Sequence, residues 1–233
     1  MSAENNHNIK ISFVMPTYNE GAQLTQTLTY LRNQMDEQCE LIIADGSSSD
    51  GTTVIAKKFT DKVLTCDKGR GQQQRQGAYH ATGEIIVFLH ADTRLPKKVL
   101  SLLRSKCTQK KCWGRFNVRI TGKSFWLKVI ATLMNARSCV SNIATGDQAI
   151  FVTRSLYSEI NGMPNIPLME DIEFSRRLKQ HTKSICMHEC AETSGRRWQK
   201  NGIARTVILM WSLRLAYYLG ASPVRLAKIY YGK

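Results

Sequence analysis

The sequence lacks several features that would each assign it to a class of protein. No apolar run reaches the roughly 18 residues that a membrane-spanning helix needs. The first eight residues are polar and mildly acidic, so we expect no secretory signal there. Neither a Gly-x-Gly-x-x-Gly motif after the first predicted strand nor a Walker lysine loop is present. A dinucleotide-binding or P-loop enzyme is therefore not expected.

Cysteine is present, but no two cysteines form a Cys-x-x-Cys pair. Seven cysteines, an odd number, predict mostly reduced thiols in a cytoplasmic protein. Residues 186–190 read Cys-Met-His-Glu-Cys, which would place three potential metal ligands on one face of a strand. A zinc site is one interpretation. The other is that these cysteines belong to the core, because no fourth ligand is in view.

Acidic residues are absent from residues 193–233, which contain eight basic ones. Residues 1–50 hold seven acidic and two basic residues, and the whole chain carries a net charge of +15. A basic end can bind nucleic acid, anionic lipid or phosphate groups. A nucleic-acid-binding protein is thus one alternative, but no RNA or DNA motif appears and nucleic acid is not an expected partner.

What the sequence does contain is an alternation of short apolar strands and helices. Apolar runs at residues 9–15, 41–44, 63–65 and 85–89 predict four strands with helical segments between them. Such strand–helix repeats predict a mostly parallel α/β sheet flanked by helices. Right-handed crossovers would bring the loops after the strands to one edge, where α/β proteins bind ligands.

The second half is less regular, and the chain ends in a segment of helical character. Length allows one sizeable domain with a short appendage, and we expect the domain over residues 1–202. Residues 203–233 are expected to form a basic amphipathic helical tail. The remaining expected elements are helices at 96–107, 125–134 and 170–180, strands at 113–120 and 149–152, and a basic loop at 195–198.

Polar side chains follow the predicted strands and suggest a ligand. Asp92 comes just after the most apolar strand, and one carboxylate can hold Mg²⁺ when substrate phosphates supply other ligands. Helix capping is the alternative for Asp92, because Pro96 marks a helix start. Asp45 either hydrogen-bonds a base or ribose or only forms a turn, and Arg70 either pairs with a phosphate or is a solvated loop cation.

Taken together, these loops resemble the family 2 glycosyltransferases with the GT-A fold. The resemblance rests on Pro16-Thr17-Tyr18-Asn19-Glu20, the Asp-Gly-Ser-Ser-Ser-Asp-Gly-Thr loop at 45–52, Gly83-Glu84 and Ala91-Asp92-Thr93. In detail the chain is similar to a compact bacterial group with Gly-Arg-Gly loops, Phe-Leu-His-Ala-Asp-Thr and Thr-Ser-Gly-Arg-Arg-Trp. The match covers nearly the whole chain, with its motifs in order.

The resemblance implies an inverting transfer of a sugar from a nucleotide-sugar donor, assisted by Mn²⁺ or Mg²⁺. It also implies that residues 1–202 are a catalytic domain, with a nucleotide-binding half over about 1–95 and an acceptor half over about 96–202. Asp92 is then the metal ligand. His90 stands where the family usually has a first aspartate, and we expect it to orient neighbours rather than bind the metal. The residues expected at the nucleotide sugar are Pro16, Thr17, Tyr18, Glu20, Asp45, Arg70, Ala91 and Asp92.

The catalytic carboxylates are also implied by the resemblance. Glu170-Asp171 looks like the family's acidic pair at a helix start, with Asp171 as the base and Glu170 as its neighbour. Two close carboxylates raise one pKa of the pair, which suits a base. Spacing alone would favour a simple acidic first turn of a helix. The residues expected at the acceptor or the diphosphate are Gly146, Asp147, Gln148, Arg196, Arg197 and Trp198.

The tail allows two interpretations. Aromatic and basic residues around an apolar stripe are typical of a helix lying on a membrane surface, which would bring the enzyme to the inner face of the membrane and to a lipid-linked acceptor. Alternatively, Leu209, Leu213 and Leu215 pack onto the catalytic domain. A membrane-surface protein without catalysis is the remaining alternative, and the acidic loop residues argue against it.

Overall fold

The computed structural model describes residues 9–232, so the predictions for residues 1–8 and for Lys233 lie outside the described residues. Its centre is one eight-stranded sheet with the order β3-β2-β1-β4-β7-β6-β8-β5. The strands are β1 (Ile11–Thr17), β2 (Cys39–Asp45), β3 (Val63–Thr65), β4 (Ile85–Phe88), β5 (Thr93–Arg94), β6 (Trp113–Thr121), β7 (Phe151–Thr153) and β8 (Ile185–Ser194).

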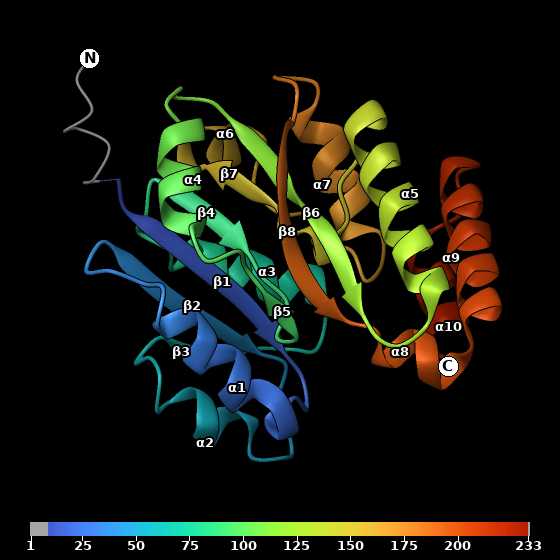
Figure 1. Cartoon of the computed structure of the whole chain (residues 1–233), viewed down its shortest axis with the longest axis horizontal. Coiled ribbons are helices and arrows are strands. Elements are labelled where there is room, and N and C mark those ends of the chain that lie inside the picture. The colour runs from blue at the N-terminus through green and yellow to red at the C-terminus, as the bar shows by residue number, and fades with distance from the viewer. Residues whose placement is uncertain (1–8, 233) are drawn as a thin grey trace.

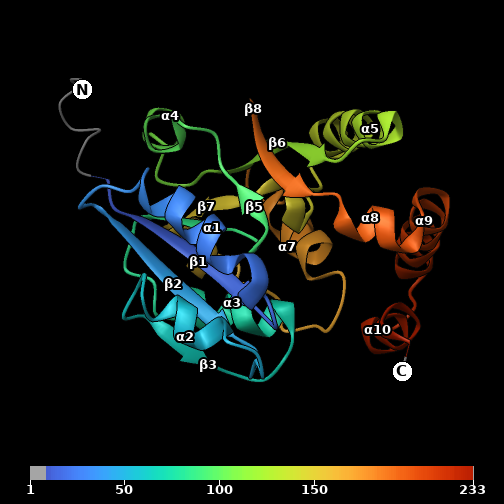
Figure 2. The ribbon, with the colours of Figure 1, turned by 60° about the horizontal axis from the view of Figure 1, so that its bottom comes forward.

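Helices cover both faces of this sheet, as Figures 1 and 2 show. The apolar side chains of α1, α2 and α4 pack on one face, and those of α3, α6 and α7 pack on the other. The helices are α1 (Gly21–Arg32), α2 (Thr52–Ala56), α3 (Arg70–Tyr79), α4 (Val99–Lys106), α5 (Phe125–Ser141), α6 (Arg154–Glu159), α7 (Glu170–Leu178), α8 (Arg196–Asn201), α9 (Ile203–Tyr218), α10 (Pro223–Tyr231) and the 3₁₀ turn η2 (Gly146–Gln148).

The predicted mostly parallel α/β architecture is confirmed. Strands β3, β2, β1 and β4 are parallel neighbours, and β6 pairs in parallel with β8. Two strands are exceptions. Strand β7 runs antiparallel to both β4 and β6 and so joins the two parallel groups, and the short edge strand β5 runs antiparallel to β8. Because β1 and β2 run side by side, the loops that follow them meet at one edge of the sheet.

Two expectations for the carboxyl-terminal part need correction. Residues 195–198 are not a loop, because Arg196 begins the short helix α8. The tail is two helices rather than one: α9 ends at Tyr218, a turn with Gly220 at φ +91° follows, and Pro223 begins α10. Proline is favourable in a first helical turn, where its missing N–H would have no intrahelical partner.

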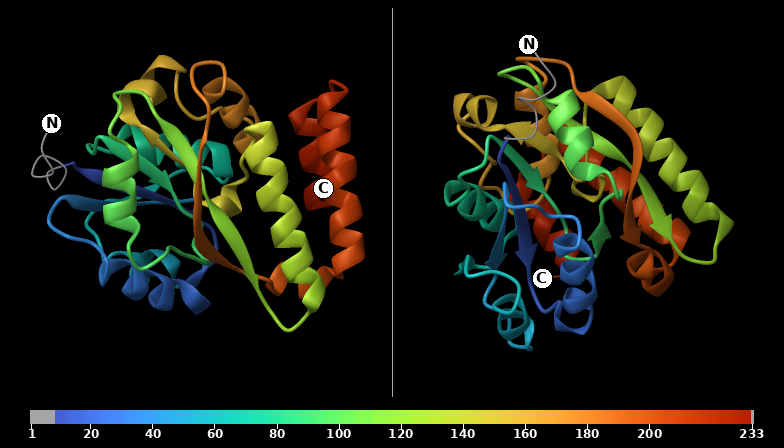
Figure 3. Two further views of the ribbon diagram at one scale, coloured as in Figure 1. Left: turned by 45° about the horizontal axis from the view of Figure 1, so that its top comes forward. Right: turned by 60° about the vertical axis from the view of Figure 1, so that its left-hand side comes forward.

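The tail packs against the rest of the chain. Leu213 of α9 and Leu226 of α10 are buried with Met169 and Ile172 at the start of α7. Leu209 is half-buried there, whereas Leu215 faces outward. In Figures 1 and 3, α9 lies beside α5, and both helices run away from α8. The tail therefore covers one end of the predicted catalytic domain.

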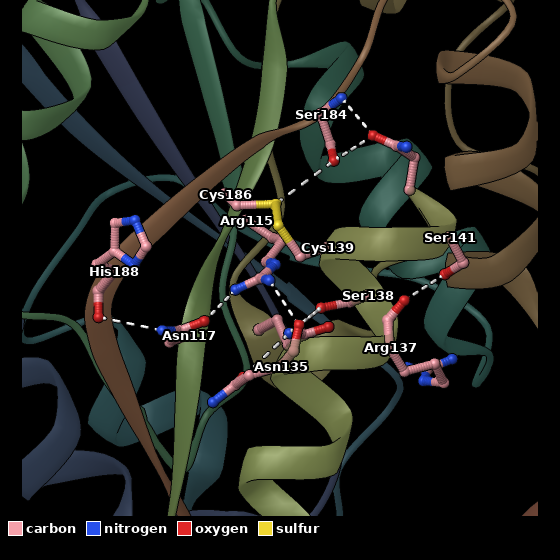
Figure 4. The surroundings of a disulfide bond; sticks show 12 residues. Arg115, Asn117, Asn135, Arg137, Ser138, Cys139, Ser141, Ser184, Cys186 and His188 are labelled. Atoms are coloured by element: carbon pink, nitrogen blue, oxygen red, sulfur yellow. Dashed lines mark hydrogen bonds between the residues drawn. A yellow bond between two sulfur atoms is a disulfide. The ribbon is translucent and has the colours of Figure 1, made fainter.

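The cysteines correct another expectation in part. Cys139 of α5 and Cys186 of β8 form a disulfide (Figure 4), while Cys39, Cys66, Cys107, Cys112 and Cys190 are free. The interpretation of residues 186–190 as a zinc site is wrong, because the disulfide removes one of its ligands. The two sulfurs meet because α5 packs along β6 and β8, which sequence separation does not reveal.

Candidate active site

The loops after β1 and β2 are fixed by Asp45. This carboxylate is buried and accepts hydrogen bonds from Thr17 Oγ1 at 2.8 Å, Ser48 N at 2.7 Å and Ser48 Oγ at 2.6 Å. Its oxygens are thus occupied by the protein, as in the turn-forming alternative. Asp45 holds the shape of the loops in which Tyr18 and Glu20 lie.

Gln73 is a structural residue of this edge that the sequence analysis missed. Its side-chain amide nitrogen donates to Thr17 O at 2.7 Å and to Ala44 O at 2.8 Å, so it ties the ends of β1 and β2 together. Only its place in the polar first turn of α3 hinted at this. Lys68, also unpredicted, places its ammonium 3.7 Å from the ring centre of Tyr18.

Asp92 lies where β4 gives way to β5. Oδ1 of Asp92 accepts from the hydroxyls of Thr93 at 3.5 Å and Thr193 at 3.4 Å, which leaves the carboxylate weakly held. Thr193 belongs to the late motif of the sequence and pairs with Thr93 between β8 and β5. The structure therefore brings these two motifs together around one half-buried carboxylate.

His90 joins this region to the turn η2. Its Nδ1 lies 3.2 Å from Asp147 Oδ1, and its Nε2 is buried without a hydrogen-bond partner in the described residues. A Cβ on Gly146 would lie 2.4 Å from that Nε2, so only glycine allows this approach. The surrounding protein disfavours a charge on Asp147, but the hydrogen bond from His90 and the charges of Arg70 and Arg197 outweigh this and lower its pKa.

Arg70 connects the start of α3 to the start of α7. Its Nη1 lies 3.5 Å from Oε1 of Glu170, a buried carboxylate with no hydrogen bond to that oxygen. Burial is the main reason why the pKa of Glu170 is raised, and the nearby Asp171 adds to it while Arg70 opposes it. A Cβ on Gly71 would lie 2.6 Å from Pro164 O, so glycine lets the start of α3 approach this loop.

Asp171 is half-buried beside Glu170. Its Oδ2 accepts from Gly146 N at 3.0 Å, and its Oδ1 accepts from Ile172 N at 2.8 Å. Met169, which precedes the pair, has a φ of +67°. This sharp turn starts α7 at Glu170, and the bond from Gly146 fixes the Asp171 carboxylate against η2.

Helix α8 supplies two further cations to the candidate site, Arg196 and Arg197. Arg196 Nη2 lies 3.8 Å from Glu20 Oε2, and the Arg197 guanidinium lies 4.2 Å from the ring centre of Tyr230. Charges on Glu170, Tyr230, Asp147 and Asp171 all raise the pKa of Arg70, although burial opposes them. Tyr230 of α10 is therefore a residue of the site, which its place in the tail had not suggested.

Several predicted site residues also make structural contacts. Gln148 is buried and donates to Ser138 Oγ at 2.9 Å. Trp198 packs with Ile203 against apolar residues of α5. Pro16 is half-buried within β1, and Ala91 is buried between His90 and Asp92.

Comparison with known proteins assigns the chain. A model of the family described as Glycosyl transferase family 2 matches residues 12–154. The O-antigen chain rhamnosyltransferase WbaN from Salmonella anatum is 24% identical over 209 residues, which cover 79% of this chain and 65% of that protein. This chain spans less than two thirds of the length of such curated relatives, and about a third of some.

Solved structures share the fold. The mannosyltransferase PcManGT from Pyrobaculum calidifontis, in complex with GDP-Man and Mn²⁺, has a TM-score of 0.66 at 18% identity, covering 91% of this chain and 62% of that chain. TarS 1-349 from S. aureus, in complex with UDP, has a TM-score of 0.64 at 18% identity, covering 80% of this chain and 60% of that chain. The GT-A fold is therefore confirmed, and the chain belongs to glycosyl transferase family 2.

Proposed function

We propose that this protein transfers a sugar from a nucleotide-sugar donor to an acceptor hydroxyl with inversion at the sugar carbon. The observation that carries the proposal is the ion pair between Arg70 and Glu170. This contact holds the start of α3 beside the Glu170–Asp171 pair, which supports a donor phosphate and a base acting within one site. Family membership and neighbours solved with UDP and with GDP-Man support a nucleotide-sugar donor.

A divalent cation, Mn²⁺ or Mg²⁺, is compatible with the residues present. No group of three or more His, Cys, Asp and Glu side chains suited to a metal ion occurs in the described part of the chain. Asp92, held only by two distant hydroxyls, would supply one ligand, and the donor's phosphates would have to supply others. A bound cation neutralises negative charge on the departing diphosphate. Neighbours solved with Mn²⁺ or Mg²⁺ support this part of the proposal.

The chain's own residues account for the remaining needs of the reaction. Asp171, oriented by Gly146 N, takes the proton of the acceptor hydroxyl. Arg70 and Arg197 both lie close enough to Asp147 for their charges to act on it, and there they would attract the diphosphate. Arg196, near Glu20, extends these cations toward the nucleotide loops.

Asp147 is the competing candidate for the base, and its surroundings argue against it. A general base works best when its pKa lies near the working pH. The pKa of Asp147 is lowered, because His90 and two arginines favour its charged form. We therefore assign Asp147 to orienting His90 and keep Asp171 as the base.

We propose a lipid-linked acceptor at a membrane surface. Within residues 9–232, no helix is both long and apolar enough to cross a membrane. However, large apolar side chains are exposed on three neighbouring helices, among basic residues such as Lys128, Arg205 and Arg225. Apolar side chains flanked by cations suit an anionic membrane surface. The exposed apolar residues are Phe125, Trp126, Leu133 and Val140 of α5, Ile208, Trp211, Leu215 and Tyr218 of α9, and Val224, Ile229 and Tyr231 of α10.

Thermal unfolding with nucleotides tests the donor site. UDP or GDP with Mn²⁺ should stabilise the protein, by about 2.7 kcal/mol at a hundredfold excess over Kd. The anomeric configuration of sugar released to water from the matching nucleotide sugar then tests inversion. If no nucleotide raised the unfolding temperature in the presence of Mn²⁺, or if the configuration were retained, the proposal would have to be abandoned.

Cosedimentation with vesicles tests the membrane surface separately. We expect binding to vesicles containing anionic lipid that weakens as salt rises, and little binding to neutral vesicles. Replacing Trp211 and Leu215, both exposed, with serine should reduce binding without loss of folding. Absence of binding at low salt would exclude the membrane and leave a soluble acceptor.

A further inference from the structure

A second pair of arginines lies near Asp171, apart from Arg70 and Arg197. These are Arg137 of α5 and Arg214 of α9. Within residues 9–232 neither forms an ion pair with a carboxylate, and Arg137 Nη2 and Arg214 Nε are buried without hydrogen-bond partners. Figure 4 shows the Arg137 guanidinium extending from α5 away from the disulfide, with no hydrogen bond reaching it from the residues drawn.

Arg137 and Arg214 lie at similar distances from α8 along their two helices. Both α5 and α9 run away from α8, and they lie side by side in Figures 1 and 3. With a rise of about 1.5 Å per residue, Arg137 lies about 18 Å along α5 and Arg214 about 17 Å along α9. Leu213, next to Arg214, packs on Ile172, the residue after Asp171. Both arginines therefore lie near the first turn of α7.

The electrostatics agree with this placement. Burial is the main cause that lowers the pKa of Arg137 to about 10, and the positive charge of Arg214 contributes in the same direction. Asp171 and Tyr218 act in the opposite direction. Two guanidinium groups that repel each other and lack a counter-ion are costly for a protein to keep, unless an anion binds between them.

We propose that Arg137 and Arg214 bind an anionic group of the acceptor, a phosphate or a carboxylate, and so hold its hydroxyl at Asp171. Arginine suits such a group because its planar fork of N–H donors matches the oxygens of a phosphate or carboxylate. The site is distinct from the cations around Asp147, which are left for the donor. This inference rests on the proposed function, and it narrows the acceptor to an anionic molecule.

The test measures binding of inorganic phosphate at low ionic strength by the shift of the unfolding temperature. The Arg137→Leu and Arg214→Leu variants keep most of the apolar stem and remove the charge. Each should weaken the apparent Kd for phosphate about tenfold or more, as expected when a charge-assisted hydrogen bond is lost. Without phosphate, both variants should unfold at or above the wild-type temperature, since the repulsion is relieved.

Control variants remove an exposed cation that has no part in either proposed surface. Lys58→Gln lies just after α2 and Lys106→Gln lies at the end of α4, and both should keep the phosphate effect. Arg137→Lys and Arg214→Lys keep the charge without the fork, and they serve if a leucine variant does not fold. Equal phosphate shifts in wild type, arginine variants and controls would overturn the proposal.

A second pair of measurements separates this inference from the proposed function. UDP or GDP binding with Mn²⁺ should be unchanged in the Arg137 and Arg214 variants, because the donor uses other cations. Loss of nucleotide binding in these variants would overturn the separation of the two anion sites. Comparing a soluble phosphate monoester with a single-chain alkyl phosphate in micelles then distinguishes a soluble acceptor from a lipid phosphate, since only the second should gain from the exposed apolar faces.

Discussion

The donor side and the acceptor side of this molecule satisfy their polar groups differently. Around the ends of β1 and β2, Asp45 and Gln73 have their hydrogen bonds filled by neighbouring protein atoms. Of the five buried side-chain atoms that lack a partner among the described residues, four come from the half after residue 95, and the fifth is His90 Nε2, which faces η2. They belong to His90, Arg115, Arg137, Glu170 and Arg214.

This difference indicates how each half handles its ligand. A filled network is already in its binding shape, and it costs little to organise when the ligand arrives. Groups left without partners destabilise the free protein, and a ligand that supplies the partners recovers that free energy. In the function proposed above, the donor side would thus be preformed around Asp45 and Gln73, whereas the acceptor side would be completed by what binds there.

Asp171→Asn should have the largest effect on activity. It tests the proposed acceptor side, because the base acts on the acceptor hydroxyl. The amide cannot take a proton, so we expect turnover of the nucleotide sugar to fall by about 10²- to 10⁴-fold. Donor binding should stay within about twofold of wild type, because the base acts on the acceptor. Turnover near the wild-type rate would move the base elsewhere, with Asp147→Asn the next variant to measure.

Asp92→Asn should affect the donor side selectively. It removes the expected metal ligand at a position that is held only by two hydroxyls. We expect Mn²⁺ to strengthen nucleotide binding in the wild type and to add little in the variant, while the unfolding temperature without ligand changes little. If Mn²⁺ enhanced binding equally in both proteins, Asp92 would not be the ligand.

Glu40→Gln tests a second filled network, at the amino ends of β1 and β2, where Glu40 accepts hydrogen bonds from Ser12, Lys62 and Thr82. Partial burial disfavours a charge on Glu40, but Lys62, Ser12 and Thr82 outweigh it and lower its pKa from 4.5 to about 2. Its stabilising effect is therefore present above pH 4.5 and is lost as the pH falls toward 2. We expect the free energy of unfolding at pH 7 to fall by about 1–2 kcal/mol, since Lys62 is solvent-exposed.

Denaturant titrations at pH 7 and pH 3 check this prediction. The difference between wild type and Glu40→Gln should shrink at the lower pH. Asp61→Asn, an exposed change close to Lys62 in sequence, is the matched control and should change stability little at either pH. A pH-independent difference would mean that the charge of Glu40 is not what stabilises the network.

Glu170→Gln should have the smallest effect and the opposite sign. Burial raises the pKa of Glu170 above 4.5, so the folded chain holds its proton more tightly than the unfolded chain does. Stability from this group is present below pH 4.5 and declines as the pH rises toward the folded value. We expect Glu170→Gln to be neutral or stabilising at pH 8, by up to about 1 kcal/mol. A marked destabilisation at pH 8 would show that Arg70 needs the charge of Glu170.

The sequence predicted the donor side better than the acceptor side for a physical reason. Asp45 and Asp92 follow apolar strands directly, so strand order alone brings them to one edge. Gln73 lies on a helix, and its role depends on reaching two carbonyls from different strands. Arg137 and Tyr230 become neighbours of the site only through the packing of α5, α9 and α10, which no local pattern specifies.

The same reason explains the errors. Periodicity predicted helix over the tail, and it is helical, but Gly220 and Pro223 divide it in two. The expectation of reduced cysteines considered spacing along the chain and missed that α5 places Cys139 against Cys186. Trp198 packs partly against apolar residues of α5, a contact that the sequence did not predict, and its role at a sugar stays a prediction.

The stacking of Arg197 on Tyr230 affects when the site can be completed during synthesis on the ribosome. Tyr230 is translated after every other residue of the candidate active site, 59 positions after Asp171. At about 5–20 residues per second, that delay lasts roughly 3–12 s. During this interval the nascent chain has its donor loops but not the aromatic ring that covers Arg197. Activity should therefore begin only late in synthesis, whatever the speed at which the sheet itself folds.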